Sequence, residues 1–524
     1  MNEIPQVFEQ NANRVFLIDS VSDRSFTYSE SYACITDLAL TMQNVGIKRG
    51  DRVAIVLLNS PEFVFLYFAC LFLGAVAVPI NPALHKRELL FLLKSSKPSA
   101  IVYSAFTEGL LSEALEKEDL VSKLCLGSAT GNTQFKNAHH WSLDSQQARS
   151  QDNWFPADGP NPTDLFSITF TSGTTALPKG VTHTVSSIFK AARAFNEELG
   201  IHADSRFYHV FPMSYMAGFL NTLICPFTAG ASVVIGPAFD AKLALTFWQA
   251  PIRYSVNTLW LVPTMLSSLS VDRLATGRSY CRDKIETICV GTAPLAERTK
   301  LDFEAKYSIS VYESYGLSEL LFVASNSRRT TNEPGSVGKL LAGVEIKVLA
   351  DDGAELPAGQ TGDIWIKTPF AFAGYFDYET LRPDPFHPDS WFESGDIGYI
   401  DEQLRLHITG RKKDLIIRGG INVSPRAIEE IMLKHEAVHE VAVVGLPHHF
   451  HGEEVAAAIR PKQPCEWRSL ENDLRKLCQA NLAQVEIPTQ FFCVEELPKN
   501  TTGKVQKAQL REQLVLNSTI AGKC

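Results

Sequence analysis

One stretch decides how this chain should be interpreted: Thr169-Phe170-Thr171-Ser172-Gly173-Thr174-Thr175-Ala176-Leu177-Pro178-Lys179-Gly180-Val181. It follows an apolar run from Leu165 to Phe170 that predicts a buried strand. Between Thr171 and Lys179 the chain places four hydroxyl side chains, a glycine and a lysine. Hydroxyls, exposed N–H groups and an ammonium together suit a polyphosphate. The spacing is not that of a Walker A loop, so we predict a phosphate-binding loop of another type.

This loop resembles the loop T-S-G-T-T-G-x-P-K-G of the adenylate-forming superfamily, which includes acyl-CoA synthetases, adenylation domains and luciferases. Nine of its ten positions match, counting the free one, and Ala176 replaces a glycine. If that position needs a positive φ, alanine reshapes the grip on phosphate. The resemblance implies that Lys179 is catalytic and that ATP is held by Thr171, Ser172, Gly173, Thr174 and Thr175.

A second element, Tyr315-Gly316-Leu317-Ser318-Glu319, resembles the Y-G-x-T-E element of the same superfamily. The resemblance implies that Tyr315 stacks on adenine and that Ser318 touches the α-phosphate. It also implies that Gly316 lies against the ligands, and that Glu319 is catalytic and helps to hold Mg²⁺, which prefers hard oxygen ligands.

A third element, Gly291-Thr292-Ala293-Pro294-Leu295, resembles the segment G-G-A-P-L that lies against the adenine. Thr292 replaces a glycine there. Small residues let a flat base approach the backbone. We therefore assign Gly291, Thr292, Ala293 and Pro294 to the nucleotide site, and Gly291 together with Gly316 to the edge of the acid pocket.

Three further elements complete the resemblance. Trp391-Phe392-Glu393-Ser394-Gly395-Asp396 resembles W-x-x-T-G-D, which implies that Asp396 accepts hydrogen bonds from the ribose. Gly410-Arg411-Lys412-Lys413-Asp414 resembles the domain junction G-R-x-K-D, with Arg411 at the ribose and Lys413 as the hinge. The segment from Leu497 to Val505 resembles L-P-(K/R)-x-x-(S/T)-G-K-(I/V), which makes Lys504 the adenylation lysine.

The superfamily activates a carboxylic acid with ATP, forming an acyl-AMP and pyrophosphate, and then rotates its small domain for thiol attack. The resemblance implies that the incoming face carries Gly419 and Gly420, beside which a pantetheine arm could pass. The implied cofactors are ATP, Mg²⁺ and coenzyme A or a carrier protein's phosphopantetheine.

The acid pocket is bordered, by resemblance, by the segment that contains Tyr215 and Met216. Many acyl-CoA synthetases have histidine at position 215, and amino-acid-activating domains place an aspartate near position 216. An ammonium buried beside methionine would lack a counter-charge. We therefore expect an apolar aliphatic or aromatic acid. Phe219, Val262 and Met265 either line the pocket or belong to the core.

Strand-like runs alternate with helical patterns, which predicts an α/β fold with mostly parallel sheets. By resemblance, residues 1–410 form a large AMP-binding domain with mixed sheets, flanking helices and a β-barrel-like subdomain. Residues 411–524 form a small, mobile α+β lid. The large part carries 33 basic and 44 acidic side chains, and the small part carries 16 and 14. We read residues 134–162 as a loop.

The composition of the 524 residues is that of a soluble globular chain, with a formal net charge of −9 that argues against a nucleic-acid partner. Residues 63–80 carry no charge, but Gly74 and Pro79 interrupt them, so we expect buried core and no transmembrane segment. The ten cysteines are scattered, and no secretory signal or common C-terminal address is visible. We therefore expect a cytoplasmic protein.

The leading hypothesis is an acid–CoA ligase acting on a small carboxylic acid. The alternatives are an enzyme that loads an acyl carrier protein and a degenerate acyl-nucleotide sensor, which the replacements Ala176 and Thr292 would motivate. His448-His449-Phe450-His451 invites a metal interpretation, but its surroundings resemble a surface loop of the superfamily, P-D-x-x-x-G-E, and we favour the loop.

Overall fold

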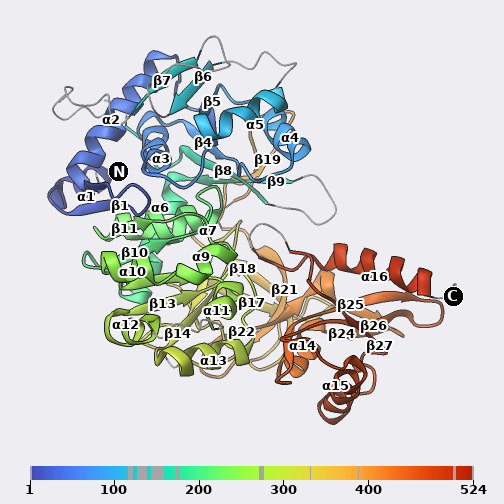
Figure 1. Cartoon of the computed structure of the whole chain (residues 1–524). Helices are drawn as coiled ribbons and strands as arrows, with labels where there is room; N and C mark the ends of the chain where they lie inside the picture. The colour runs from blue at the N-terminus through green and yellow to red at the C-terminus, as the bar shows by residue number, and fades with distance from the viewer. Residues whose placement is uncertain are drawn as a thin grey trace.

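A computed structural model describes residues 3–115, 122–126, 138–142, 159–171, 178–270, 276–330, 332–387, 389–499 and 503–521. A large N-terminal part carries most of the helices and strands, and the chain ends in a smaller part that lies to one side of it (Figure 1). The two parts have separate hydrophobic cores. The predicted α/β class is confirmed.

The first large sheet has the strand order β16-β15-β14-β13-β12-β10-β11-β1-β2. Its neighbours from β14 to β1 are parallel, and antiparallel strands close both ends. Short apolar runs such as Thr287–Val290 are buried along their whole length, as parallel strands covered on both faces must be. The strands are β1 (Val15–Asp19), β2 (Ser25–Thr27), β10 (Arg206–His209), β11 (Ser232–Ile235), β12 (Thr258–Leu261), β13 (Thr287–Val290), β14 (Val311–Leu317), β15 (Leu321–Ser325) and β16 (Lys339–Leu340).

The second large sheet has the order β20-β19-β9-β8-β4-β3-β5-β6-β7. Strand β7 lies inside residues 134–162, so the interpretation of that whole stretch as a loop was wrong: its Ala138–Trp141 pairs in parallel with β6. A four-residue strand among polar neighbours gives too short a pattern to detect. The strands are β3 (Arg52–Val56), β4 (Val76–Pro79), β5 (Ala100–Ser104), β6 (Ser122–Leu126), β7 (Ala138–Trp141), β8 (Leu165–Thr171), β9 (Lys179–Thr184), β19 (Gly374–Phe376) and β20 (Pro383–Pro385).

Helix α3 (Pro61–Leu73) is buried along almost its whole length, with every residue from Phe63 to Leu73 inside the core. Ser60 caps its N-terminus, and Gly74 ends it with φ 65°, which frees the chain to enter β4. The expectation of buried core over residues 63–80 is confirmed. In the described residues no helix is both long and apolar enough to span a membrane.

The helices of the large domain cover the sheets. They are α1 (Glu3–Gln10), α2 (Tyr28–Asn44), α3 (Pro61–Leu73), α4 (Lys86–Ser96), α5 (Ala105–Leu115), α6 (Val185–Leu199), α7 (Met216–Phe219), the π-helix η2 (Leu220–Ile224), α8 (Cys225–Thr228), α9 (Ala241–Thr246), α10 (Gln249–Tyr254), α11 (Pro263–Ser270), α12 (Thr276–Lys284) and α13 (Glu297–Tyr307).

The third sheet is antiparallel, with the order β17-β18-β21-β22. Its strands are β17 (Glu345–Leu349), β18 (Gly362–Lys367), β21 (Phe392–Ile400) and β22 (Leu406–Arg411). Strands β21 and β22 are consecutive and pair as an antiparallel hairpin. The described strands form an open sheet, however, which corrects the expected barrel-like subdomain: four strands leave two edges that do not pair with each other.

The small domain is α+β, as predicted, with a sheet ordered β24-β23-β26-β25 and β27 beside β26. Helices α14 and α15 pack on one face and α16 on the other, which gives two apolar layers. Its elements are the 3-10 helix η3 (Lys412–Asp414), β23 (Ile416–Arg418), β24 (Ile421–Val423), α14 (Pro425–Leu433), β25 (Val438–His448), β26 (Gly452–Pro461), α15 (Trp467–Asn481), β27 (Gln490–Cys493) and α16 (Lys507–Ala521).

Candidate active site

The predicted phosphate loop connects two antiparallel strands, β8 and β9. Thr171 pairs with Lys179 across this ladder, and the Thr171 hydroxyl donates to the Lys179 carbonyl at 3.4 Å. The strands therefore fix where the loop begins and ends. Five predicted phosphate-site positions lie outside the described residues: Ser172, Gly173, Thr174, Thr175 and the replaced position Ala176.

A tyrosine that the sequence did not single out contacts two of the predicted charged groups of the site, Lys179 and Glu319. The Lys179 ammonium lies 4.6 Å from the centre of the Tyr375 ring, close enough for a cation–π contact. The Tyr375 hydroxyl donates to Glu319 Oε1 at 2.7 Å. Burial, followed by the Glu319 charge, raises the pKa of Tyr375, which keeps the hydroxyl protonated as a donor. Lys179 and Glu319 thus share one neighbour.

The turn that carries Glu319 leaves no room for a side chain at Gly316. A Cβ there would lie 2.0 Å from the carbonyl oxygen of Leu321, which takes φ 58° in the same turn. The backbone N–H of Phe372 donates to the Glu319 carbonyl at 2.8 Å. Glycine at position 316 is therefore a steric requirement of the turn that presents Ser318 and Glu319.

The predicted ribose-binding aspartate lies among predicted nucleotide residues. The Tyr315 hydroxyl donates to Asp396 Oδ2 at 2.6 Å, and Arg411 Nε lies 2.9 Å from Asp396 Oδ1. Asp396 is only 2% exposed. Burial and the Asp396 charge raise the pKa of Tyr315 well above its ordinary value. Three positions predicted from three separate motifs therefore meet at one carboxylate.

Lys504 comes from the small domain and lies beside this group. Burial lowers its pKa to about 8; the charges of Arg411 and Lys413 add to the effect, while Asp396 and Asp414 oppose it. The preceding Gly503 packs on the large domain, since a Cβ there would lie 2.7 Å from Thr264 Oγ1 in α11. The lysine is thus held between like and unlike charges at the junction of the two domains.

Thr292 adopts a backbone conformation that is unusual for a branched residue. Its φ is 72°, in the left-handed region that favours glycine. Its side chain is hydrogen-bonded to Tyr215, and burial raises the pKa of that tyrosine. At the neighbouring Gly291 a Cβ would lie 2.8 Å from Ser314 Oγ. The turn is tightly packed, with Ala293 half-buried and Pro294 exposed.

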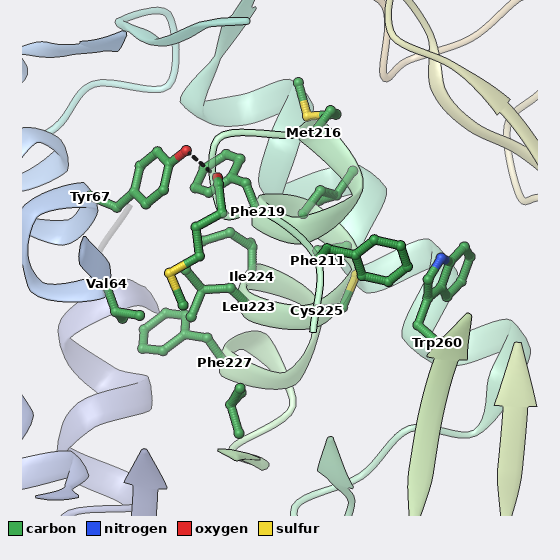
Figure 2. Close-up of a cluster of buried hydrophobic side chains, with 14 of the residues drawn as sticks. Val64, Tyr67, Phe211, Met216, Phe219, Leu223, Ile224, Cys225, Phe227 and Trp260 are labelled. Carbon is green, nitrogen blue, oxygen red and sulfur yellow. Dashed lines mark hydrogen bonds between the residues drawn. The ribbon is translucent and has the colours of Figure 1, made fainter. Parts of the chain in front are cut away.

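The segment around Tyr215 leads into a dense apolar cluster (Figure 2). Met216 begins α7 and is 8% exposed, while Phe219 stacks on Tyr67 with ring centres 4.2 Å apart. The Tyr67 hydroxyl donates to the carbonyl of Met213 at 2.9 Å, which satisfies a buried polar group. The pocket residues considered earlier, Phe219, Val262 and Met265, are all buried in this core.

Gly419 and Gly420 form the turn between β23 and β24, with φ values of 59° and 86°. They line a cavity of about 690 Å³ on the small domain, together with Lys413, Phe450 and other residues. Neither Lys504 nor Asp396 lines this cavity. The paired glycines therefore lie apart from Lys504 and Asp396, while Lys413 contributes both to the cavity and to the charges around Lys504.

The histidine-rich loop brings together His448, His451 and Glu454, whose potential ligand atoms lie within 4.8 Å of one another. His448 Nδ1 accepts the backbone N–H groups of Phe450 and His451 at 3.3 and 3.2 Å, and Arg418 lies 2.9 Å from Glu454. A neutral ring that accepts at Nδ1 carries its proton on Nε2, which opposes metal binding there. We retain the interpretation as a surface loop.

Comparison with known proteins agrees with this geometry. Residues 5–376 match the AMP-binding enzymes, and residues 427–504 match the C-terminal domain of AMP-binding enzymes. The chain belongs to the AMP-binding enzyme family, the adenylate-forming superfamily that its motifs resemble. Within that family its relatives are most like acyl-CoA synthetases.

Among the proteins that match almost the whole chain are two relatives and one solved structure. A long-chain fatty-acid–CoA ligase of Mycobacterium tuberculosis is 30% identical over 95% of this chain and 94% of its own. A sulfoacetate–CoA ligase of Cupriavidus necator is 28% identical over 95% and 94%. The ATP-bound structure of MatB from Rhodopseudomonas palustris is 27% identical, with a TM-score of 0.83 over 98% of both chains.

Proposed function

We propose that this protein activates a carboxylic acid with ATP, releases pyrophosphate, and transfers the acyl group from the acyl-AMP to coenzyme A. The observation that carries the proposal is the position of Lys504. It comes from the small domain, yet its charge environment includes Asp396 of the large domain and Arg411 at the end of β22. Two relatives that match almost the whole chain, both CoA ligases, support the same reaction class.

Each group around the site has a role that its chemistry suits. Lys179 and Lys504 offset negative charge on the phosphates as pyrophosphate leaves, which is the main work of such a site. Asp396 and Arg411 hold the ribose, Tyr315 lies at the adenine, and Ser318 binds the α-phosphate. Thr171 and the residues up to Thr175 offer hydroxyl and N–H donors to the remaining phosphates.

Glu319 is the residue that would hold Mg²⁺. The donor set fits the ion, because the carboxylate is a hard oxygen ligand and Tyr375 fixes its direction through one oxygen. When bound, the ion neutralises phosphate charge. The protein's own contribution is the orientation of Glu319 and the nearby positive charge of Lys179.

We propose an apolar aliphatic or aromatic acid as the substrate, with fatty acids as the first class to test. The segment Tyr215–Met216 leads into the apolar cluster of Figure 2. An amino-acid substrate would bury its ammonium beside Met216, which offers no counter-charge. The fatty-acid–CoA ligase among the relatives supports this choice, whereas the sulfoacetate–CoA ligase shows that the family also accepts a charged acid.

For the second half of the reaction, thioester formation, we assign Lys413 as the hinge between residues 1–410 and 411–524. Gly419 and Gly420 then lie on the face of the small domain that turns toward the acyl-AMP. The cavity beside these glycines is lined by Lys412 and Arg511, whose positive charges suit a thiol cofactor that carries phosphate groups. A carrier protein's phosphopantetheine would use the same face.

We keep a cytoplasmic location as a prediction, supported by the free thiols of the described cysteines.

The test is acid-dependent pyrophosphate release across fatty, short branched, aryl and amino acids, each with and without CoA. We expect release with apolar acids and a CoA-dependent thioester product. A holo carrier protein replaces CoA in a parallel series, and preferential acylation of that carrier would favour the loading enzyme. An absence of acid-dependent pyrophosphate release across the panel would contradict the ligase and leave the nucleotide sensor.

A further inference from the structure

A buried histidine touches the turn that presents Ser318 and Glu319, although no motif drew attention to it. His183 is the penultimate residue of β9, four positions after Lys179, and is 0% exposed. Its Nε2 lies 2.6 Å from the carbonyl oxygen of Ser318. Strand β9 belongs to one nine-stranded sheet and β14 to the other, so this contact bridges the two large sheets.

The direction of this hydrogen bond follows from the partners. A carbonyl oxygen can only accept, so His183 Nε2 carries the proton and Nδ1 is the acceptor of a neutral ring. The Ser187 hydroxyl lies 3.4 Å from that Nδ1. Burial lowers the pKa of His183 to about 4, which keeps the ring neutral at physiological pH. The histidine is a fixed donor with no charge of its own.

Three contacts hold the turn from outside. His183 binds the carbonyl of Ser318, the Phe372 N–H binds the carbonyl of Glu319, and Tyr375 binds the Glu319 carboxylate. A donor fixed on the Ser318 carbonyl restricts the backbone dihedral angles on either side of this peptide, ψ of Ser318 and φ of Glu319. The contact at Ser318 is the one that ties this peptide to the strand following the phosphate loop.

We propose that His183 is a positioning residue that orients the Ser318–Glu319 peptide for binding of metal-complexed ATP. This inference rests on the proposed function, and in particular on Glu319 as the metal-holding residue. It adds a residue that acts through Glu319 and touches no substrate itself. Its effect should therefore depend on the metal and disappear when Glu319 can no longer hold it.

The test is a double-mutant cycle on nucleotide binding, measured by calorimetry with Mg²⁺·ATP and with ATP in EDTA. His183→Leu removes the donor, and His183→Gln retains an N–H of similar reach. We expect His183→Leu to weaken Mg²⁺·ATP binding about three- to tenfold, as loss of one hydrogen bond implies, with a smaller change in EDTA. His183→Gln should recover most of the affinity.

The cycle asks whether the effect passes through Glu319. In a Glu319→Gln background, His183→Leu should change Mg²⁺·ATP affinity by less than about twofold, because coupled residues are not additive. Ser187→Ala is the matched control: it alters the other ring nitrogen and should leave the metal dependence unchanged. Thermal unfolding of every variant separates loss of binding from loss of fold.

Two results would overturn the proposal: parental Mg²⁺·ATP affinity in His183→Leu, or an equal loss in both Glu319 backgrounds. If His183→Leu does not fold, His183→Asn, whose shorter amide cannot reach Ser318, enters the same cycle and the same criteria apply. Failure of the proposed function looks different, because the parent protein itself would then show no acid-dependent pyrophosphate release.

Discussion

Replacement of Lys504 by arginine should keep a positive charge at this position but remove its loss of the proton near pH 8. In the structure, burial and then the charge of Arg411 lower the pKa of Lys504 to about 8, against the opposing charge of Asp396. With that pKa, about nine tenths of the side chains are charged at pH 7 and about one tenth at pH 9. A guanidinium stays charged across this range.

We expect kcat/KM for ATP in acid-dependent ATP–pyrophosphate exchange to fall about tenfold per pH unit above pH 8, because this parameter reports the ionisation of the free enzyme. In kcat the fall should come at higher pH, since bound phosphates favour the ammonium. Lys504→Arg should keep its own level of exchange nearly constant up to about pH 10. Lys504→Ala should lose most of the exchange, about 10²-fold or more.

Thioester formation from supplied acyl-AMP is the internal control. It should survive Lys504→Ala and lack the decline that begins near pH 8. Unfolding does not explain that decline: the unfolded chain holds the Lys504 proton up to a higher pH than the folded chain, so this group makes the folded state more stable as pH rises above 8. The same decline in Lys504→Arg, or equal loss of both half-reactions in Lys504→Ala, would refute the reasoning.

Three further substitutions test other parts of the site. At φ 72° a side chain strains the backbone, so Thr292→Gly removes a strain that Thr292→Ala retains. The glycine variant should be more stable than the alanine variant by about 1 kcal/mol in chemical denaturation. Equal stabilities would argue against strain. Tyr375→Phe removes the donor to Glu319 but keeps the ring beside Lys179, and should raise the half-saturating Mg²⁺ concentration of exchange about three- to tenfold, with an unchanged Mg²⁺ titration as the contrary result. Gly420→Ala meets no neighbouring atom but strains the backbone at φ 86°. Because we assign this turn to the thiol, the variant should slow thioester formation from supplied acyl-AMP more than it slows exchange. The reverse order would contradict the assignment.

The sequence predicted the elements of the fold that carry strong local patterns. The long apolar run from Phe63 onward is a buried helix and strand, and short runs such as Thr287–Val290 are parallel strands. Strand β7 was missed because four residues give no periodicity, and the expected barrel is an open sheet because closure depends on which edges meet in space. Pairing of edges is a tertiary property that no local pattern encodes.

The same division holds for the candidate site. Motifs predicted the positions of Tyr315, Asp396 and Lys504, since each occupies a fixed place in a recognisable string of residues. They did not predict Tyr375 or His183, whose partners lie 56 and 135 positions away in the chain.

The amino-acid sequence by itself thus determined the family, the order of the elements and the chemical groups that we propose for phosphate, ribose and acid. Only the tertiary structure decided how those groups are held: which tyrosine meets Glu319, and how Asp396 and Arg411 surround Lys504. It also showed that a threonine occupies left-handed backbone at position 292. The physical reason is that hydrogen bonding, burial and charge act over a few ångströms in space, whereas the partners come from different sheets and domains.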